Sequence, residues 1–222
     1  MEQLYLWDSN QPARRWNLVK FCILVGAVYC CLEQYIMKAM RIRPATGKIK
    51  LRELQTERLR LNALCEADAD RFFALKSDPE VTLPYFMQPL TREASDRKLA
   101  TLMAESEEGE SLCWAIRKKD AQEFIGSMVL WNLEPEKAQA EVGYELIPEY
   151  HGKGFAGEAL EAVLAEAFLA LGFERVVALP AKQNLPSRRL LEGHGFVEAG
   201  LMEEGGHLMV RYLRQCLGCA QV

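Results

Sequence analysis

The residues that most directly suggest chemistry lie in one short stretch, Ile147-Pro-Glu-Tyr-His-Gly-Lys-Gly-Phe-Ala-Gly-Glu-Ala-Leu160. The residues before it alternate partly between apolar and polar, as in a half-buried strand, and Pro148 ends that ladder because proline has no backbone donor. After it, apolar residues recur at helical spacing until Gly172. Gly152 and Gly154 permit a tight turn at the helix N-terminus, where unpaired N–H groups and the helix dipole favour an anion. The stretch therefore predicts an anion-binding loop.

Polar residues with the right types for proton transfer flank this loop. Glu141 and Glu145 share one face of the predicted strand because their spacing is even. A carboxylate there could take a proton directly or through water, although a solvent-facing glutamate is the commoner case. Asn184 and Ser187 stand at the start of a predicted short helix, where asparagine is a frequent cap and serine an ordinary first-turn residue.

Metal chemistry has little support in the sequence. The three histidines, at positions 151, 194 and 207, fall in a loop, a turn and a hairpin. Cys216-Leu-Gly-Cys219 is a single C-x-x-C without a second pair or a nearby histidine cluster. We expect no metal cofactor.

The elements that must position these residues follow the order β, α, α, three strands, α, β, α, β, β. We expect strands over 56–61, 111–117, 123–131, 138–147, 173–179, 196–201 and 207–213, and helices over 67–76, 91–105, 156–171 and 186–193. An acidic run over 105–110 and the residues 132–137 are expected to form turns. Helices interleaved with a mixed sheet predict an α/β or α+β domain.

Two known anion-binding loops fit this stretch poorly. A Walker loop needs Ser or Thr directly after Gly-Lys, whereas Gly154 follows Lys153. Gly152, Gly154 and Gly157 match the dinucleotide pattern G-x-G-x-x-G, which alone is a weak signal. A nucleotide-binding oxidoreductase would carry this loop near its start, with two βαβ halves after it, and here the loop lies two-thirds along the chain.

The stretch resembles instead the pyrophosphate loop of the GNAT superfamily, Gln/Arg-x-x-Gly-x-Gly/Ala, and most closely that of the RimJ/RimL type. Glu149 departs from this pattern at the Gln/Arg position. Four further blocks resemble that family and occur in its order: Thr56-Glu-Arg-Leu-Arg-Leu61, Asp78-Pro-Glu-Val81 with Pro89-x-Thr91, Asn184-x-x-Ser187, and Leu191-Glu-x-x-Gly-Phe196. The resemblance covers residues 54–214.

The resemblance implies the GNAT acyl-CoA N-acyltransferase fold, a mixed and mostly antiparallel sheet flanked by helices, with acetyl-CoA as co-substrate. The residues that it assigns to the cofactor are Tyr144, Leu146, Ile147, His151, Gly152, Lys153, Gly154, Phe155, Ala156 and Asn184. Many relatives use a tyrosine as the acid, but that position is Leu191 here, so the resemblance points to Ser187 as the group that protonates the departing thiolate. Glu141 and Glu145 are the candidate bases.

Composition limits the partners. The chain has 222 residues, 27 Lys and Arg against 31 Asp and Glu, and a net charge of −4, which argues against nucleic acid as the main partner. Its seven cysteines are scattered and odd in number, so a reducing, cytoplasmic location is expected rather than a disulfide framework. A monomer or a homodimer is expected.

The chain divides into an extension over 1–50, an acetyltransferase domain over 51–215 and a tail over 216–222. The apolar run Phe21–Leu32 is short of the ~20 residues of a transmembrane helix. Three interpretations remain: a start placed too far upstream, with initiation at Met37 or Met40, an interfacial anchor, or a genuine extra helix. Membrane association is not expected.

The function that these patterns favour is direct transfer of an acetyl group from acetyl-CoA to a primary amine. The resemblance most implies a protein N-terminal amine, of the ribosomal-protein kind. An acetyltransferase for small amines or antibiotics is one alternative. A non-catalytic acyl-CoA-binding module is the other, because the usual tyrosine is absent.

Overall fold

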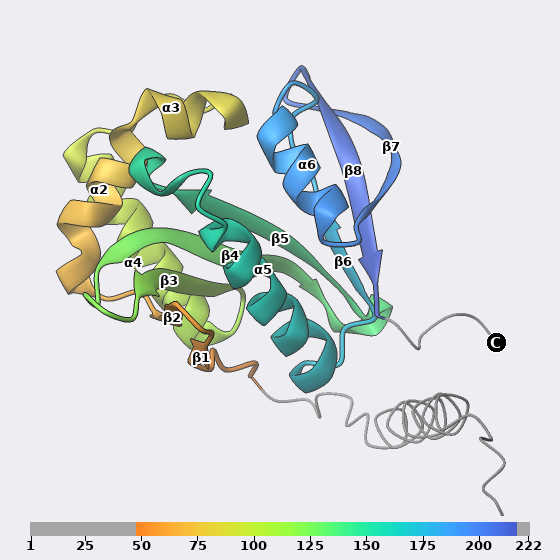
Figure 1. Cartoon of the computed structure of the whole chain (residues 1–222), viewed down its shortest axis with the longest axis horizontal. Helices are drawn as coiled ribbons and strands as arrows, with labels where there is room; N and C mark the ends of the chain where they lie inside the picture. The colour runs from red at the N-terminus through yellow and green to blue at the C-terminus, as the bar shows by residue number, and fades with distance from the viewer. Residues whose placement is uncertain (1–47, 217–222) are drawn as a thin grey trace, which may run out of the picture. The chain divides into compact units, whose positions relative to one another are not determined.

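The computed structural model describes residues 48–216, and they form one sheet covered by helices on both faces (Figure 1). The strands are β1 (Leu54–Gln55), β2 (Leu59–Ala63), β3 (Leu112–Lys118), β4 (Phe124–Glu134), β5 (Gln139–Leu146), β6 (Arg175–Ala178), β7 (Val197–Glu204) and β8 (His207–Gln215). The helices are η1 (Glu66–Asp68), α2 (Ala69–Ser77), α3 (Pro79–Thr82), η2 (Leu83–Tyr85), α4 (Arg92–Glu108), η3 (Pro135–Lys137), η4 (Pro148–Tyr150), α5 (Phe155–Ala165), η5 (Glu166–Ala170) and α6 (Leu185–Gly193). The strand order is β1-β2-β3-β4-β5-β6-β8-β7. All neighbouring strands are antiparallel except β5 and β6, so the predicted mixed, mostly antiparallel sheet is confirmed.

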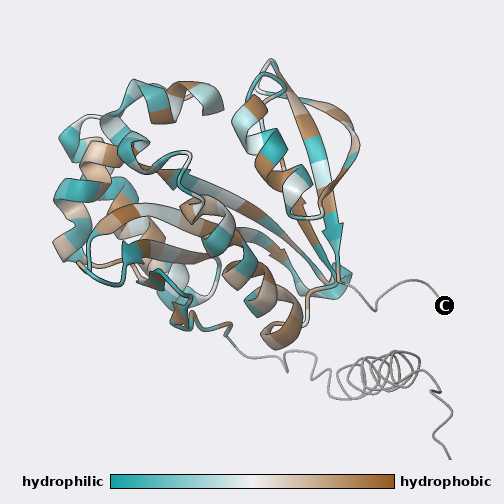
Figure 2. Cartoon of the chain, viewed as in Figure 1, coloured by the Kyte–Doolittle hydropathy of each residue, from teal (hydrophilic) through white to brown (hydrophobic). Residues whose placement is uncertain are grey.

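The sheet has a core on each face because side chains alternate along its central strands. On β3, Trp114 and Ile116 pack in the core that α5 covers, whereas Cys113 and Ala115 pack in the core under α2 and α4. Hydrophobic residues are concentrated on the central strands and on α5 (Figure 2). By contrast, every residue of the edge strand β7 is exposed.

The expected elements are present, several with ends that differ by a few residues, and the following differences can be related to local structure. The strand expected over 56–61 is β2, which begins only at Leu59 because a turn precedes it, in which the Thr56 N–H donates to the Leu59 carbonyl oxygen at 3.0 Å; the two-residue strand β1 before that turn was not expected. Helix α4 continues through the acidic run to Glu108, consistent with the good helix propensity of glutamate, and ends at Gly109 in the left-handed conformation. Strand β4 extends to Glu134 through an irregularity in its pairing, so the expected turn shrinks to η3.

The boundary expected near residue 50 falls slightly within the folded part, since Ile49 packs against the α5-side core. Most of the predicted extension, including the apolar run and Met37 and Met40, lies outside the described residues, as does Cys219. Among the described residues, no helix is long and apolar enough to cross a membrane.

Candidate active site

The candidate site is a cavity that opens where β5 and β6 separate. The two strands are paired only from Gln139 to Glu141, opposite Arg175 to Val177. Beyond that point a cavity of about 830 Å³ lies between the end of β5, residues 150–157, η2 and α6. A parallel pair that diverges exposes a strand edge inside the protein, and such an edge can bind an extended ligand through main-chain groups.

The edge of β5 presents alternate residues to this cavity. The N–H of Ile147 donates to the Ile125 carbonyl oxygen at 2.9 Å, so Ile147 uses its main chain to pair with β4. Since main-chain groups alternate between the two sides of a strand, those of Tyr144 and Leu146 point away from β4. Two side chains reach their carbonyl oxygens: Tyr85 Oη donates to Tyr144 O at 2.7 Å, and His151 Nε2 donates to Leu146 O at 2.8 Å.

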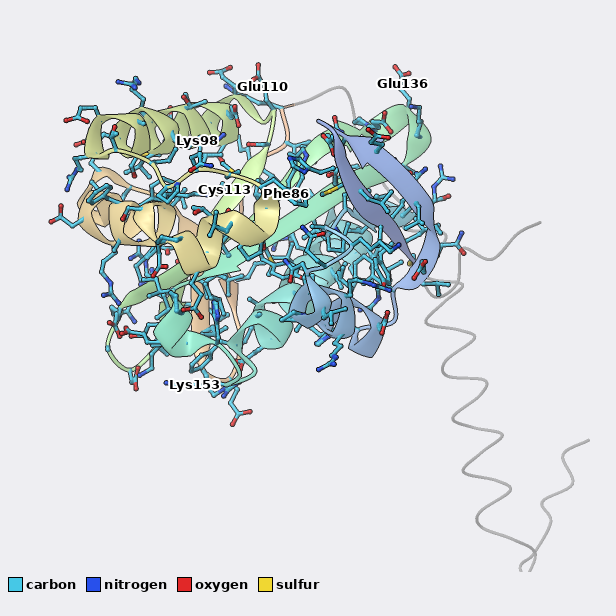
Figure 3. All side chains as sticks on the ribbon, turned by 90° about the horizontal axis from the view of Figure 1, so that it is seen from above. Phe86, Lys98, Glu110, Cys113, Glu136 and Lys153 are labelled. Atoms are coloured by element: carbon cyan, nitrogen blue, oxygen red, sulfur yellow. The ribbon has the colours of Figure 1, made fainter. Side chains whose placement is uncertain are left out.

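The predicted anion-binding loop lies at one end of the cavity. Gly152 and Gly154 have φ values of 69° and 79°, a conformation that glycine adopts without steric cost. Gly154 is the N-cap of α5 and supplies no side-chain cap, so the first-turn N–H groups of that helix remain available to a ligand. Lys153 is exposed on this loop, at the opposite edge of the domain from Glu110 (Figure 3).

Gly157, the third glycine of the G-x-G-x-x-G pattern, lies in the first turn of α5 and has a packing role. A Cβ at this position would lie 2.7 Å from the imidazole ring of His194, so only glycine lets α5 approach the end of α6 this closely. His194 is itself fixed, because its Nδ1 donates to the Leu190 carbonyl oxygen at 2.7 Å. The G-x-G-x-x-G pattern thus has a structural explanation that needs no dinucleotide.

Helix α6 brings the predicted hydroxyl group to the cavity. The Ser187 N–H donates to Asn184 Oδ1 at 3.2 Å, so Asn184 caps the helix as its residue type suggests, and both residues line the cavity. Ser187 Oγ lies 2.8 Å from Tyr144 Oη. Burial raises the pKa of Tyr144 to about 12, with the Ser187 hydrogen bond acting in the opposite direction, so the phenol is protonated near neutral pH. Leu191 is fully buried in the core and lines no part of the cavity.

The two candidate carboxylates differ in environment. Glu145 lines the cavity, and its Oε2 lies 2.5 Å from Nζ of Lys76, with the two side chains 16% and 10% exposed. Glu141 lies outside the cavity lining and accepts a hydrogen bond from Asn132 at 3.3 Å. Burial raises the pKa of Glu141 above its ordinary value, and that hydrogen bond opposes the shift. The even spacing predicts one strand face for both glutamates, but only Glu145 lines the cavity.

Ten of the thirteen predicted site residues line this one cavity: Tyr144, Glu145, Leu146, His151, Gly152, Gly154, Phe155, Ala156, Asn184 and Ser187. Glu141, Ile147 and Lys153 do not line it. Sequence reasoning missed Lys76, the buried partner of Glu145, because nothing near it in the chain marks it as functional. Two neighbouring aromatic residues differ in their position: Tyr85 lines the cavity, whereas Phe86 stacks on His207 with ring centroids 3.6 Å apart.

Metal ligation finds no support in this part of the structure. Over residues 48–216, no group of three His, Cys, Asp or Glu side chains is arranged to hold a metal ion. The polar groups that converge on the cavity include backbone N–H groups, hydroxyls and the Glu145 carboxylate, which is paired with an ammonium group. This set suits an extended, phosphate-bearing ligand rather than a cation.

Comparison with known proteins agrees with this geometry. The profile of the acetyltransferase (GNAT) domain matches residues 58–197. The uncharacterised N-acetyltransferase YoaA of Bacillus subtilis (strain 168) is 34% identical over 152 residues, which cover 68% of this chain and 86% of that protein. The crystal structure of a GNAT-family acetyltransferase from Bacillus anthracis superposes with a TM-score of 0.66 at 21% identity, over 74% of this chain and 98% of that one. A structure of RimL, a ribosomal L7/L12 alpha-N-protein acetyltransferase in complex with coenzyme A, gives a TM-score of 0.65 at 19% identity, over 74% and 98% of the two chains.

Proposed function

The chain belongs to the GNAT family of acetyltransferases and is an N-acetyltransferase; from that premise we propose that it moves an acetyl group from acetyl-CoA directly to the primary amine at a protein N-terminus. The observation that carries the proposal is the cavity between the separated strands β5 and β6, with a bare helix N-terminus at one end and a hydroxyl group beside it. A small amine or an antibiotic is the alternative acceptor.

Three features of the cavity support acetyl-CoA as the co-substrate. Backbone N–H groups from Gly152 to Ala156 would donate hydrogen bonds to the pyrophosphate oxygens, because these groups lie at the positive end of α5. The main-chain N–H groups of Tyr144 and Leu146 would donate to the pantetheine arm, as a strand pairs with a neighbour, while Tyr85 and His151 donate to the carbonyl oxygens of these two residues. Asn184 lines the same cavity and would lie beside that arm.

Acetyl-CoA supplies its acetyl group as a thioester, and the residues around the cavity handle two protons. Glu145 would accept the proton that the amine loses as its nitrogen bonds to the acetyl carbon, directly or through water. Ser187 Oγ would give its proton to the sulfur as the carbon–sulfur bond breaks, and the proton that Glu145 took from the amine would return to the serine oxygen through water, so that both side chains end as they began. Tyr144 can donate to Ser187 Oγ at the same time, which leaves the serine proton directed at the sulfur. Because positioning contributes several kcal/mol, these groups need only assist.

The surface beside the cavity favours a peptide over a polycationic amine. Leu83 and Met87 are 54% and 41% exposed on the segment that supplies Tyr85, and Leu185 is 50% exposed at the start of α6. Exposed apolar side chains next to a binding cleft suit a chain with apolar side chains more than an aminoglycoside or a polyamine. An N-terminal amine also has a pKa near 8, so it is partly neutral at cellular pH and places little demand on a base.

The test is thiol release from acetyl-CoA by the full chain with a panel of acceptors, followed by mass spectrometry of the product. The panel holds peptides with Ala, Ser or Met at the N-terminus, the same peptides with a blocked N-terminus, lysine peptides, polyamines and aminoglycosides. We expect release with the free N-terminal peptides and none after blocking. Release with polyamines or aminoglycosides alone would overturn the peptide proposal in favour of the alternative, and acetyl-CoA binding without release on any acceptor would contradict the proposed transfer.

A further inference from the structure

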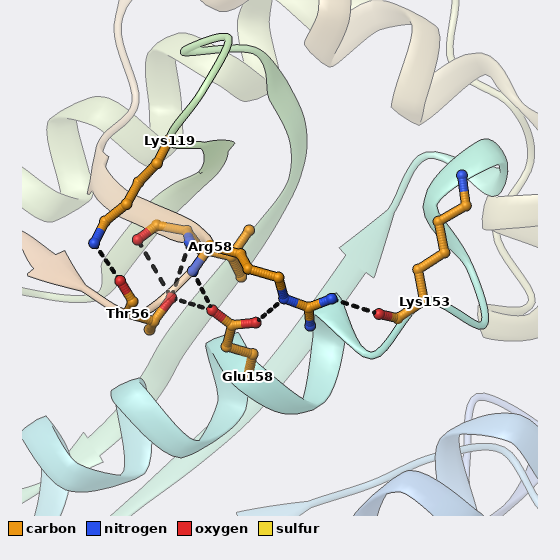
Figure 4. Close-up of polar contacts among 6 residues, drawn as sticks. Thr56, Arg58, Lys119, Lys153 and Glu158 are labelled. Carbon is orange, nitrogen blue, oxygen red and sulfur yellow. Dashed lines mark hydrogen bonds and ion pairs between the residues drawn. The ribbon is translucent and has the colours of Figure 1, made fainter.

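Arg58, from a distant part of the chain, contacts the predicted anion-binding loop and the helix that follows it. Arg58 Nη1 donates to the Lys153 carbonyl oxygen at 3.0 Å, and Nε donates to Glu158 Oε2 at 2.6 Å (Figure 4). The guanidinium carbon lies 4.5 Å from the centroid of the Phe155 ring, close enough for a cation–π contact. One side chain thus contacts the loop, the first residue of α5 and its first turn.

Arg58 is itself held by the turn in which it lies. Its own N–H donates to Glu158 Oε1 at 2.8 Å, and the Thr56 hydroxyl donates to the same oxygen at 2.5 Å. The N–H of Lys119 donates to the Arg58 carbonyl oxygen at 2.9 Å, and the Lys119 ammonium group donates to the Thr56 carbonyl oxygen. The turn is therefore fastened both to the end of β3 and to α5, so the guanidinium is already in place before a ligand arrives.

This contact fixes the direction of a backbone donor. In a planar trans peptide the carbonyl group and the following N–H point in opposite directions. With the Lys153 carbonyl held toward Arg58, the N–H of Gly154 must point away from it, and Gly154 lines the cavity. Gly154 is also where a side chain would crowd the guanidinium, since a Cβ there would lie 3.3 Å from Arg58 Nη2.

Arg58 also offsets a charge that would oppose anion binding. Glu158 lies in the first turn of α5, next to the N–H groups that a phosphate would use. Burial works to raise the pKa of Glu158, but the hydrogen bonds from Thr56 and Arg58 outweigh it and hold the pKa below its ordinary value. Glu158 is therefore ionised at neutral pH, and the guanidinium at 2.6 Å neutralises it locally.

We propose that Arg58 is a positioning residue for the phosphate-binding loop: it orients the Gly154 N–H and neutralises Glu158, so that the loop binds the pyrophosphate of the co-substrate. The inference rests on the proposed use of acetyl-CoA. It predicts a defect confined to ligands that carry a pyrophosphate, because Arg58 contacts the loop and no part of the β5 edge.

The experiment measures dissociation constants of the full chain for acetyl-CoA and for acetyl-pantetheine, which has the thioester and arm but no pyrophosphate. Arg58→Met should weaken acetyl-CoA binding about tenfold, the effect expected when an orienting charge-assisted hydrogen bond is lost, and leave acetyl-pantetheine binding unchanged. Arg58→Lys should recover part of the loss, because an ammonium group can pair with Glu158 but cannot donate to the Lys153 carbonyl oxygen at the same time. Far-ultraviolet circular dichroism and urea unfolding would confirm that both variants fold.

The matched control is Arg92→Met. Arg92 has a similar exposure, pairs with Asp70 at 2.6 Å and Asp96 at 2.9 Å, and lies over the Phe73 ring at 5.7 Å, but it is on α4 and away from the loop. It should leave both dissociation constants unchanged. Equal weakening of both ligands by Arg58→Met, or no weakening of either, would overturn the inference while the proposed function stands. A wild-type chain that binds acetyl-CoA no better than acetyl-pantetheine would overturn the inference and also count against acetyl-CoA as co-substrate.

Discussion

Removing the ammonium group of Lys76 should lower the free energy of unfolding by more than breaking any exposed ion pair of the domain would. Lys76 Nζ and Glu145 Oε2 are 2.5 Å apart, and their side chains are 10% and 16% exposed. Lys76→Met keeps most of the apolar stem, but it removes the ammonium group, which lies 5.5 Å from the centroid of the Phe72 ring, and leaves the Glu145 carboxylate with no countercharge. Breaking a buried pair from one side costs 3–5 kcal/mol, and the adjoining cavity gives some access to water, so we expect the lower end, about 3 kcal/mol.

Urea unfolding followed by circular dichroism measures this cost. For a chain of this size the same loss corresponds to a melting temperature lower by roughly 6 to 12 °C. The double variant Lys76→Met/Glu145→Gln should recover most of the loss, because it leaves no unpaired charge. Arg92→Met, which breaks exposed pairs, should cost less than about 1 kcal/mol.

The same variants separate stability from chemistry. If Glu145 accepts the amine proton, the double variant regains stability but not acetyl transfer, whereas a purely structural pair would regain both. A loss below about 1 kcal/mol for Lys76→Met, or costs of the single variants that simply add in the double variant, would refute the assignment of this pair as a coupled, buried one.

Three further outcomes follow from named contacts. Ser187→Ala should lower turnover about tenfold and leave the acetyl-CoA dissociation constant unchanged, because the hydroxyl acts on the leaving group; unchanged turnover would remove Ser187 from the mechanism. Gly126→Ala should destabilise the domain by about 2 kcal/mol or more in urea unfolding, since its Cβ would lie 2.2 Å from the Glu145 carbonyl oxygen, whereas Gly193→Ala, with open space around it, should not destabilise. The lowered pKa of Glu158 gives a stabilisation that is complete above its unfolded-state pKa and is lost as pH falls through the folded-state value. Between pH 5 and 3 the urea midpoint of the wild type should therefore fall more than that of Glu158→Gln, and parallel curves would contradict the shift.

The parts of the site that the sequence predicted depend on neighbours along the chain. The turn at Gly152 and Gly154 and the helix after it are fixed by glycine and by helical spacing over a few residues. The helix cap at Asn184 likewise joins two residues that are only three positions apart in the chain. Where an element began or ended at a residue other than the expected one, the cause was a local feature that the hydrophobic pattern does not show. The turn at Thr56, after which β2 begins, is an example.

Relations between distant segments were decided by the tertiary structure. Glu141 and Glu145 look alike in the sequence, and only the point at which β5 leaves β6 determines which of them lines the cavity. Lys76 meets Glu145 across 69 residues, and Tyr144 meets Ser187 across 43. Such contacts depend on which strands pair and on which face of the sheet each helix covers. Hydrophobic periodicity along the chain predicts neither of these.

The sequence alone thus determined the fold class, from the order of its elements, and the glycine turn before α5 with the residue types around it, which arise from backbone conformation and side-chain alternation within one element. The tertiary structure decided the partners: Lys76 for Glu145, and Arg58 for a glutamate 100 residues away. The physical reason is that a charge or a hydrogen-bond donor acts over a few ångströms of space, whatever the separation along the chain.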